Sequence, residues 1–314
     1  MKIKPGIKDI LWMATGAAVL LICILVVLHF HKDQDPAAQL AFKARRVDLV
    51  RRMQFDLASA SESEKSAVLA ITDQDSQTFA DQARAASAKV EQERRELGEL
   101  LTAGGTPGEK DLLAQFTGAF AEFQRIDNDL LALAVKNTNL KAYSLAFGPA
   151  ASALNEMDAA LSRLVAANTD SPEAKSMMLL AFGAQAIALR IQTLLPPHIA
   201  EENDKKMDEL EALMATEDAQ VRKGLDGLAA LPGFKSDPEL ATAMTRYAEF
   251  SKIKTQILAL SRENTNVRSL SISLNQKRKV MLACQATLST LQQVILAEPI
   301  AGVTYGTPVR PRRW

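Results

Sequence analysis

The chain has 314 residues, of which 47% are hydrophobic but only 5% aromatic, a composition typical of helical proteins. Lysine plus arginine and aspartate plus glutamate number 37 each, so no net positive charge is present to attract a polynucleotide, and nucleic acid is excluded as a predicted partner. At this length we expect about two domains of roughly 150 residues each.

The first predicted element is a transmembrane helix. Residues 10–28 are uncharged and mostly apolar, and at 1.5 Å per residue they match a hydrocarbon core of about 30 Å. A cleavable signal peptide is the alternative, but its apolar region is shorter and a small-residue cleavage site follows it, whereas His29 and Phe30 follow here. Lys2, Lys4 and Lys8 precede the span, which predicts that residues 1–9 are cytoplasmic and that the bulk lies outside.

The rest of the chain contains an internal repeat. Residues 121–144 align without a gap onto residues 248–271 at an offset of 127, with Phe123 on Phe250 and the Asn-Thr-Asn of 137–139 on that of 264–266. Such self-similarity predicts duplication of a unit of about 125 residues, which is an ordinary domain size.

Apolar residues recur every three, four or seven positions throughout both units, which predicts helices separated by glycine and proline breakers. The helices are predicted at 36–74, 76–102, 109–146, 150–167, 172–195, 198–230, 238–274 and 277–297. The predicted fold is all-α, with two tandem antiparallel four-helix bundles at 36–168 and 171–297. The join between Asp73 and Ser76 has no glycine or proline, so a continuous helix there stays open.

Four asparagines are the candidate site residues: Asn137, Asn139, Asn264 and Asn266. Asn137 and Asn264 fall in register with the apolar stripes, so we expect both to face a bundle interior. They form either a polar layer that contacts a ligand or buried hydrogen-bonded residues that fix helix register. The second interpretation is favoured, because duplication preserves a structural feature more readily than a specialised site.

No pattern in the sequence predicts catalysis or a cofactor. The three histidines, at positions 29, 31 and 198, form no Glu-x-x-His pair, and the haem-attachment, phosphate-loop and nucleophile-elbow motifs are absent from the sequence. Cys23 lies in the predicted span and Cys284 on a distant helix, so no disulfide is expected. We predict a protein that is not an enzyme and has no cofactor, and a redox or metal-binding bundle is the least favoured alternative.

The last residues, 298–314, differ from everything before them. They contain prolines and glycines and end in Arg310, Arg312, Arg313 and Trp314. A disordered tail is the favoured interpretation, and an extended docking peptide anchored by arginine and tryptophan is the alternative.

The stripe of Phe123, Ile126, residues 131–133 and Asn137, with its continuation to Ser144 and the helix from 150 to 164, resembles a known family. It is similar to the periplasmic four-helix-bundle ligand-binding domain of methyl-accepting chemotaxis proteins and related sensor kinases. The resemblance implies a bacterial inner-membrane protein whose bulk is periplasmic. It also implies a homodimer or a protein partner, and a possible small-molecule ligand.

The sequence departs from that family in two respects. Only residues 298–314 follow the last predicted helix, so we expect neither a return span nor a cytoplasmic signalling part. Tandem bundles also differ from the usual single bundle, and from the family's helical bimodular variant, which nests two bundles within six helices. We therefore predict a non-catalytic, single-pass sensor-like binding module or accessory subunit of a membrane complex. The alternative is a ligand-binding module that signals through a separate partner.

Overall fold

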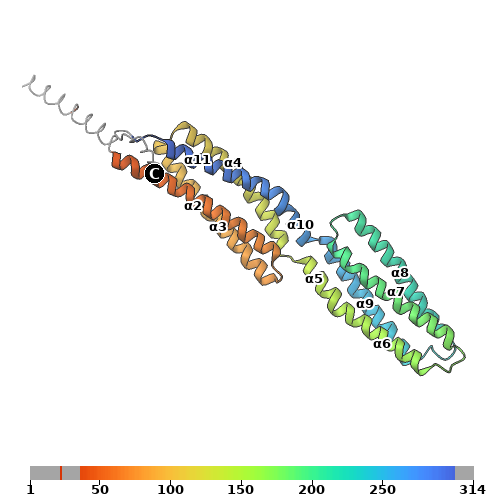
Figure 1. The fold of residues 1–314 in the computed structure, drawn as a ribbon. Coiled ribbons are helices and arrows are strands. Elements are labelled where there is room, and N and C mark those ends of the chain that lie inside the picture. The colour runs from red at the N-terminus through yellow and green to blue at the C-terminus, as the bar shows by residue number, and fades with distance from the viewer. Residues whose placement is uncertain (1–21, 23–35, 301–314) are drawn as a thin grey trace, which may run out of the picture. The chain divides into compact units, whose positions relative to one another are not determined.

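The computed structural model describes Ile22 and residues 36–300, and every regular element in this part of the chain is helical, which confirms the predicted all-α class there. In chain order the elements (Figure 1) are α2 (Pro36–Leu69), α3 (Asp73–Gly104), α4 (Pro107–Ala134), α5 (Thr138–Leu145), the π-helical turn η1 (Ala146–Ala150), α6 (Ala151–Ala167), α7 (Ala174–Ala200), α8 (Asp204–Ala230), α9 (Pro238–Glu263), α10 (Thr265–Ile272), the π-helical turn η2 (Ser273–Lys277) and α11 (Arg278–Ala297).

Two predicted segments fall largely outside the described residues. Of the predicted span at 10–28 only Ile22 is described, and it is helical and exposed. The tail side chains Arg310, Arg312, Arg313 and Trp314 also lie outside the described part.

Local sequence explains where several helices begin. The Thr106–Glu109 stretch forms a capping box, in which the Glu109 N–H donates to Thr106 Oγ1 at 3.3 Å and the Thr106 N–H donates to Glu109 Oε2 at 2.9 Å. Asp237 caps α9 by accepting from two backbone N–H groups, with Pro238 at the first helical position. The open question near residue 73 is settled as a break, because Thr72 accepts from the Asp75 N–H at 3.0 Å and α3 begins at Asp73.

The positions of the internal breaks differ from the prediction. The predicted helices 109–146 and 238–274 are each interrupted at an asparagine, Asn137 and Asn264, whose backbones are left-handed. The predicted break at Gly148-Pro149 is absent, because the widened turn of η1 accommodates a proline that has no N–H to donate. The chain likewise stays helical through η2, where a break was predicted between residues 274 and 277.

The described residues divide into two compact units. Unit 1 contains the described parts of Met1–Ser59 and Leu282–Trp314 together with Ala86–Ala121, and unit 2 contains Ala60–Ala85 and Glu122–Met281. Within unit 1, the buried Arg46 of α2 pairs with Glu109 of α4 at 2.8 Å and contacts Glu298 just beyond α11. Lys43 of α2 donates to the carbonyl of Leu296 at 2.7 Å, so α2, α4 and the end of α11 are tied together here.

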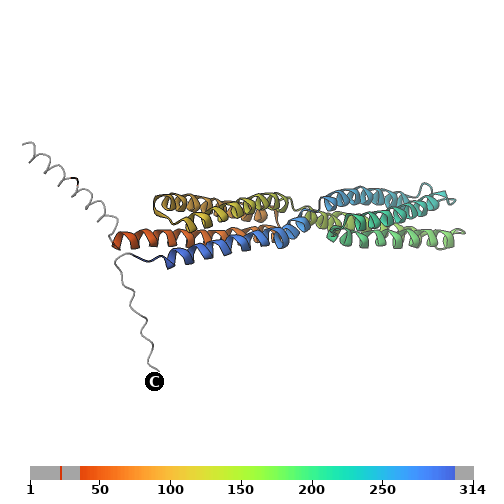
Figure 2. The same ribbon diagram turned by 90° about the horizontal axis from the view of Figure 1, so that it is seen from above.

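Unit 2 contains two apolar clusters. The larger one joins α6, α7, α8 and α9 through residues such as Met157, Ala184, Val221 and Phe250, and α6 and α9 run side by side in both views (Figures 1 and 2). The smaller one joins the end of α2, the start of α3 and the end of α4, with Ile272 of α10 packed against it.

These clusters correct the predicted bundles at 36–168 and 171–297. α6 was assigned to the first bundle but packs with α7, α8 and α9, while Ile272, at the end of a helix assigned to the second bundle, packs against α2, α3 and α4. The physical reason is that the chain does not turn back at Gly148-Pro149 or before α11. α6 therefore belongs to unit 2 together with α7, α8 and α9, whereas α11 from Leu282 onward belongs to unit 1.

Candidate functional site at the asparagine turns

Two left-handed turns bring all four candidate asparagines together in unit 2. Asn137 and Asn264 both have φ 51° and ψ 38°, and a new helix starts at the next residue in each case. Asparagine tolerates this conformation better than other residues with a Cβ atom, because its short amide side chain hydrogen-bonds locally. The sequence therefore places a sharp turn where periodicity alone predicts an unbroken helix.

The threonine that follows each turn caps the opposite helix. The Thr138 N–H donates to Thr265 Oγ1 at 3.2 Å, and the Thr265 N–H donates to Thr138 Oγ1 at 3.1 Å. α5 and α10 thus satisfy one another's first N–H groups, which otherwise have no partner within their own helix.

Asn139 and Asn266, the last residues of the two Asn-Thr-Asn tripeptides, exchange hydrogen bonds in the same reciprocal way through their side-chain oxygens. The Asn139 N–H donates to Asn266 Oδ1 and the Asn266 N–H donates to Asn139 Oδ1, both at 3.1 Å. Asn139 Nδ2 also donates at 2.7 Å to Asn264 Oδ1 and to the carbonyl of Ile199, and Asn266 Nδ2 donates to Asn137 Oδ1 at 2.9 Å. The result is a closed polar network with a local two-fold pattern.

The local two-fold pattern does not extend to the side-chain amides of Asn137 and Asn264, which donate to different kinds of acceptor. Asn137 Nδ2 donates to Asp73 Oδ1 at 3.0 Å, whereas Asn264 Nδ2 donates to the Glu201 carbonyl at 2.7 Å. The Asn137 hydrogen bond, with one from Lys141, lowers the pKa of Asp73 below its ordinary value. One end of the network therefore reaches an exposed carboxylate, and the other reaches backbone.

The predicted asparagines are thus assembled into one site. Asn137, Asn139 and Asn264 are buried and Asn266 is half-buried. The sequence reasoning missed the two threonines, although the identical Asn-Thr-Asn tripeptides were the available signal. A pocket of about 290 Å³ adjoins the network and is lined by Asn139 and Asn266 with apolar side chains that include Tyr143 and Leu270.

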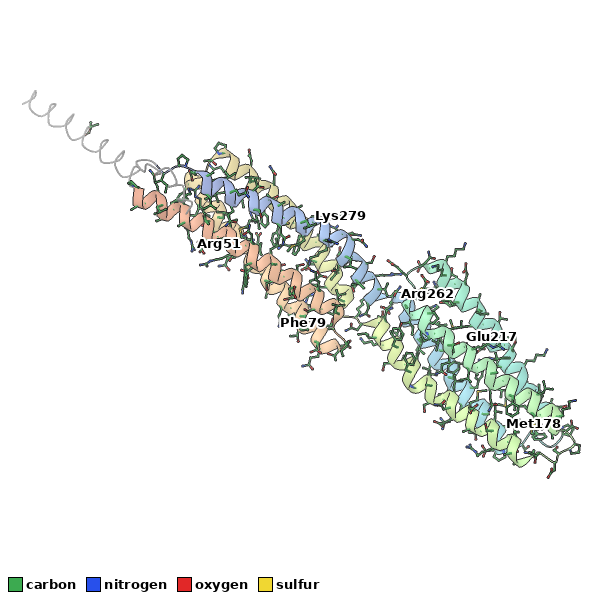
Figure 3. The ribbon with its side chains drawn as sticks, in the orientation of Figure 1. Arg51, Phe79, Met178, Glu217, Arg262 and Lys279 are labelled. Atoms are coloured by element: carbon green, nitrogen blue, oxygen red, sulfur yellow. The ribbon has the colours of Figure 1, made fainter. Side chains whose placement is uncertain are left out.

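A buried histidine contacts Ser261, a residue that shortly precedes the Asn264 turn in the sequence. His198 Nδ1 lies 2.8 Å from Ser261 Oγ, and His198 Nε2 lies 2.8 Å from Glu211 Oε1. Burial lowers the pKa of His198, and the hydrogen bond from Arg262, labelled in Figure 3, lowers the pKa of Glu211. Serine, histidine and glutamate are the residue types of a hydrolytic triad, but Ser261 and His198 are both fully buried, so no substrate reaches this serine.

The described residues contain two candidate membrane-spanning stretches and no candidate metal site. Ala174–Ala200 and Pro238–Ala297 are long and apolar enough to cross a membrane, but core helices pass the same test and both stretches supply buried residues to unit 2, so they are weak evidence for a span. Among the described residues, no group of three histidine, cysteine, aspartate or glutamate side chains is arranged to hold a metal ion.

The fold and the network define an all-helical protein of the four-helix-bundle type. Residues 55–177 match the family described as a four helix bundle sensory module for signal transduction, which is less than half of the chain. A search of curated proteins returned no match. The matched stretch runs from α2 through α6 into α7, so its helices contribute to two different apolar clusters in this chain.

Proposed function

We propose that this protein is a single-pass, membrane-anchored helical-bundle module that binds a partner outside the bacterial inner membrane and catalyses no reaction. The carrying observation is the similarity of residues 55–177 to a sensory four-helix bundle. The predicted span at 10–28 and the lysines before it support the anchor and a cytoplasmic N-terminus. The protein acts as a sensor-like accessory or scaffold subunit of a membrane complex, so any signal crosses the membrane through the partner.

Purification of the tagged full-length chain from membranes in a mild detergent tests whether the protein has a stable partner. The proposal expects a membrane protein to co-purify in stoichiometric amount. Recovery of this chain alone, at native expression level, would contradict the subunit role. The topology is tested separately by fusing alkaline phosphatase after Ile300, because this enzyme is active only outside the cytoplasm. An inactive fusion would place the helical part of the chain in the cytoplasm and would contradict the proposed topology.

A second candidate function is binding of a small molecule, and the pocket of about 290 Å³ beside Asn139 and Asn266 favours it. Its apolar walls suit a ligand with a hydrocarbon or aromatic body. A thermal-shift screen of the full-length chain against amino acids, organic acids and aromatic compounds tests this function, since a ligand that binds only the folded state raises the melting temperature. A flat response across the screen would exclude it.

The same screen uses Val267→Trp as the matched variant. Val267 lines the pocket, so a larger side chain at this position should fill it. A ligand that binds in this pocket should lose its stabilising effect on the variant. A ligand that stabilises both forms equally binds elsewhere.

A further inference from the structure

Unit 2 contains a buried layer of three ionisable side chains that lies outside the asparagine network. Glu64 of α2, Asp127 of α4 and Lys277 of η2 have exposed fractions of 0%, 2% and 1%. The Lys277 ammonium donates a short hydrogen bond to Asp127 and lies 3.5 Å from Glu64 Oε2. It also lies 4.2 Å from the centroid of the Phe123 ring, a cation–π contact. Two carboxyl groups therefore share one ammonium.

Glu64 is the unusual member of this layer. Both of its side-chain oxygens are buried, and within residues 36–300 neither makes a hydrogen bond of good geometry. The Ser273 hydroxyl and the Lys277 ammonium lie near enough to act on the carboxyl group, and both favour its ionised form. The next turn of the helix is apolar, because Ala67 and Val68 belong to the smaller core cluster. An ionised carboxylate without hydrogen bonds is very unfavourable in such surroundings, whereas a neutral carboxylic acid is tolerated.

The charges around Glu64 do not balance when every group is ionised. Asp127 faces it from α4 and Lys277 from η2, while the charge on Arg84 of α3 acts on Asp127 from an exposed position where it already pairs with Asp81. Within the layer itself, two negative charges face one positive charge. A single bound proton makes the layer neutral.

We propose that this layer is a proton-binding site, in which Glu64 and Asp127 share one proton and the packing of α2 against α4 and η2 depends on it. When the proton leaves, the O–H bond of the carboxylic acid breaks and the proton passes to water. One uncompensated negative charge then stays in an apolar layer. Water must enter to solvate that charge, so the layer loosens as the pH rises.

The pKa shifts agree in direction with this geometry. Burial raises the pKa of Glu64 above its ordinary value of 4.5 and raises the pKa of Asp127, while the Lys277 charge opposes both shifts. A carboxyl group whose pKa is raised by folding contributes stability that is complete below its unfolded pKa. That stability is lost as the pH rises through the folded pKa. The folded chain should therefore become less stable on going from acidic to neutral or alkaline pH.

The first test measures the melting temperature of the full-length chain in detergent from about pH 4 to about pH 9 by circular dichroism, for the wild type and for Glu64→Gln. Glutamine keeps the shape and removes the titration. The wild-type melting temperature should fall with rising pH in this window. That of Glu64→Gln should fall less steeply and exceed the wild type at the alkaline end, with the remaining slope arising from Glu93, whose pKa burial raises to about 7. Glu62→Gln, an exposed change on the same helix, should follow the wild type.

The second test detects the proton directly, by infrared spectroscopy of the protein in heavy water at neutral pH. A buried carboxylic acid gives a C=O stretching band distinct from that of a carboxylate. The wild type should show this band. Glu64→Gln and Asp127→Asn should each show a weaker band than the wild type, because either change leaves one carboxylate to balance Lys277. Glu93, whose pKa burial raises to about 7, contributes equally in all three proteins. The proposal is overturned if the wild type lacks the band, if either variant keeps its full wild-type intensity, or if Glu64→Gln keeps the wild-type pH dependence.

Discussion

The two sequence-related segments place a buried charge at the same position, with opposite sign. Asp127 and Lys254 are separated by the repeat offset of 127, and their exposed fractions are 2% and 9%. Asp127 belongs to the layer with Glu64 and Lys277. Lys254 instead donates to Asp218 at 2.8 Å, and Asp218 also accepts from Tyr247 at 2.9 Å and pairs with Arg222 at 2.8 Å. One cluster has too few donors for its carboxyl groups, and the other has enough.

The contrast shows that several hydrogen bonds are needed to outweigh burial, because Asp127 accepts one from Lys277 and its pKa is still raised. Burial acts to raise the pKa of Asp218, but the hydrogen bonds from Lys254, Arg222 and Tyr247 together outweigh it and lower the pKa to about 2. Burial also acts on Glu64, whose oxygens make no hydrogen bond of good geometry in the described chain, and there it prevails. The same bundle architecture thus contains a carboxylate that favours ionisation and a carboxyl group that opposes it.

The largest effect should follow removal of the only ammonium in the buried layer. Lys277→Met leaves Glu64 and Asp127 facing one another without a cation, and loss of one partner of a buried pair costs about 3–5 kcal/mol of unfolding free energy. Urea unfolding at neutral pH measures the cost, which should shrink on acidification as both carboxyl groups take up protons. Lys279→Met, on the exposed side of α11 (Figure 3), is the control and should cost little. An equal cost for both variants would mean that the layer is not a charged cluster.

The corresponding change in the other segment should cost less. Lys254→Met removes one of the four side-chain donors to Asp218, and the other three still satisfy the carboxylate, which is 17% exposed. We expect a loss of about 2 kcal/mol, within the range for a hydrogen bond to a charged group. The same urea series measures it, with the exposed Lys252→Met as control. A loss as large as that of Lys277→Met would remove the distinction between the two clusters.

A pH series on Asp218 should show the opposite dependence from Glu64. Folding lowers the pKa of Asp218 from 3.8 to about 2, so its stabilising effect is complete above the unfolded pKa and is lost as the pH falls through the folded value. Asp218→Asn should therefore be less stable than the wild type by about 2 kcal/mol at neutral pH, with the difference fading towards acid. Melting curves of both proteins across this range test the sign. A difference that grows on acidification would contradict it.

The sequence predicts helices well and the exchange of helices poorly, for physical reasons. Helical periodicity reports which face of a segment is buried but not against which neighbour, so α6 was paired with the wrong helices. Pro149 signals a break, yet η1 accommodates it, while the actual turn depends on the modest tolerance of Asn137 for left-handed backbone.

The candidate sites show the same limit. The Asn-Thr-Asn tripeptides identify the network, but the reciprocal caps of Thr138 and Thr265 require two distant turns to meet, which no local pattern encodes. Asp127 was detectable as a charge between Phe123 and Leu130 on an apolar stripe. Its partner Glu64 was not, because only the packing of α2 against α4 brings the two together.

The smallest predicted effect is a difference in stability between variants of the Asn137 turn and variants of the Asn264 turn. Asn264→Gly and Asn137→Gly both keep the left-handed backbone accessible, so each variant reports mainly its lost side-chain hydrogen bonds. Asn264 bonds to the buried Asn139 amide and to a backbone carbonyl. Asn137 bonds to the half-buried Asn266 amide and to the exposed Asp73. We expect Asn264→Gly to be the less stable by about 0.5 kcal/mol, measured by urea unfolding.

The matched alanine variants show whether that difference arises from the side chains. Alanine adds the strain of a left-handed residue, about 1–2 kcal/mol, equally at both turns, so both alanine variants should be less stable than their glycine counterparts by a similar amount. The difference between Asn264 and Asn137 should be unchanged in the alanine pair, because the same hydrogen bonds are lost. If the difference disappears or reverses with alanine, the backbone and not the amide contacts distinguishes the two turns.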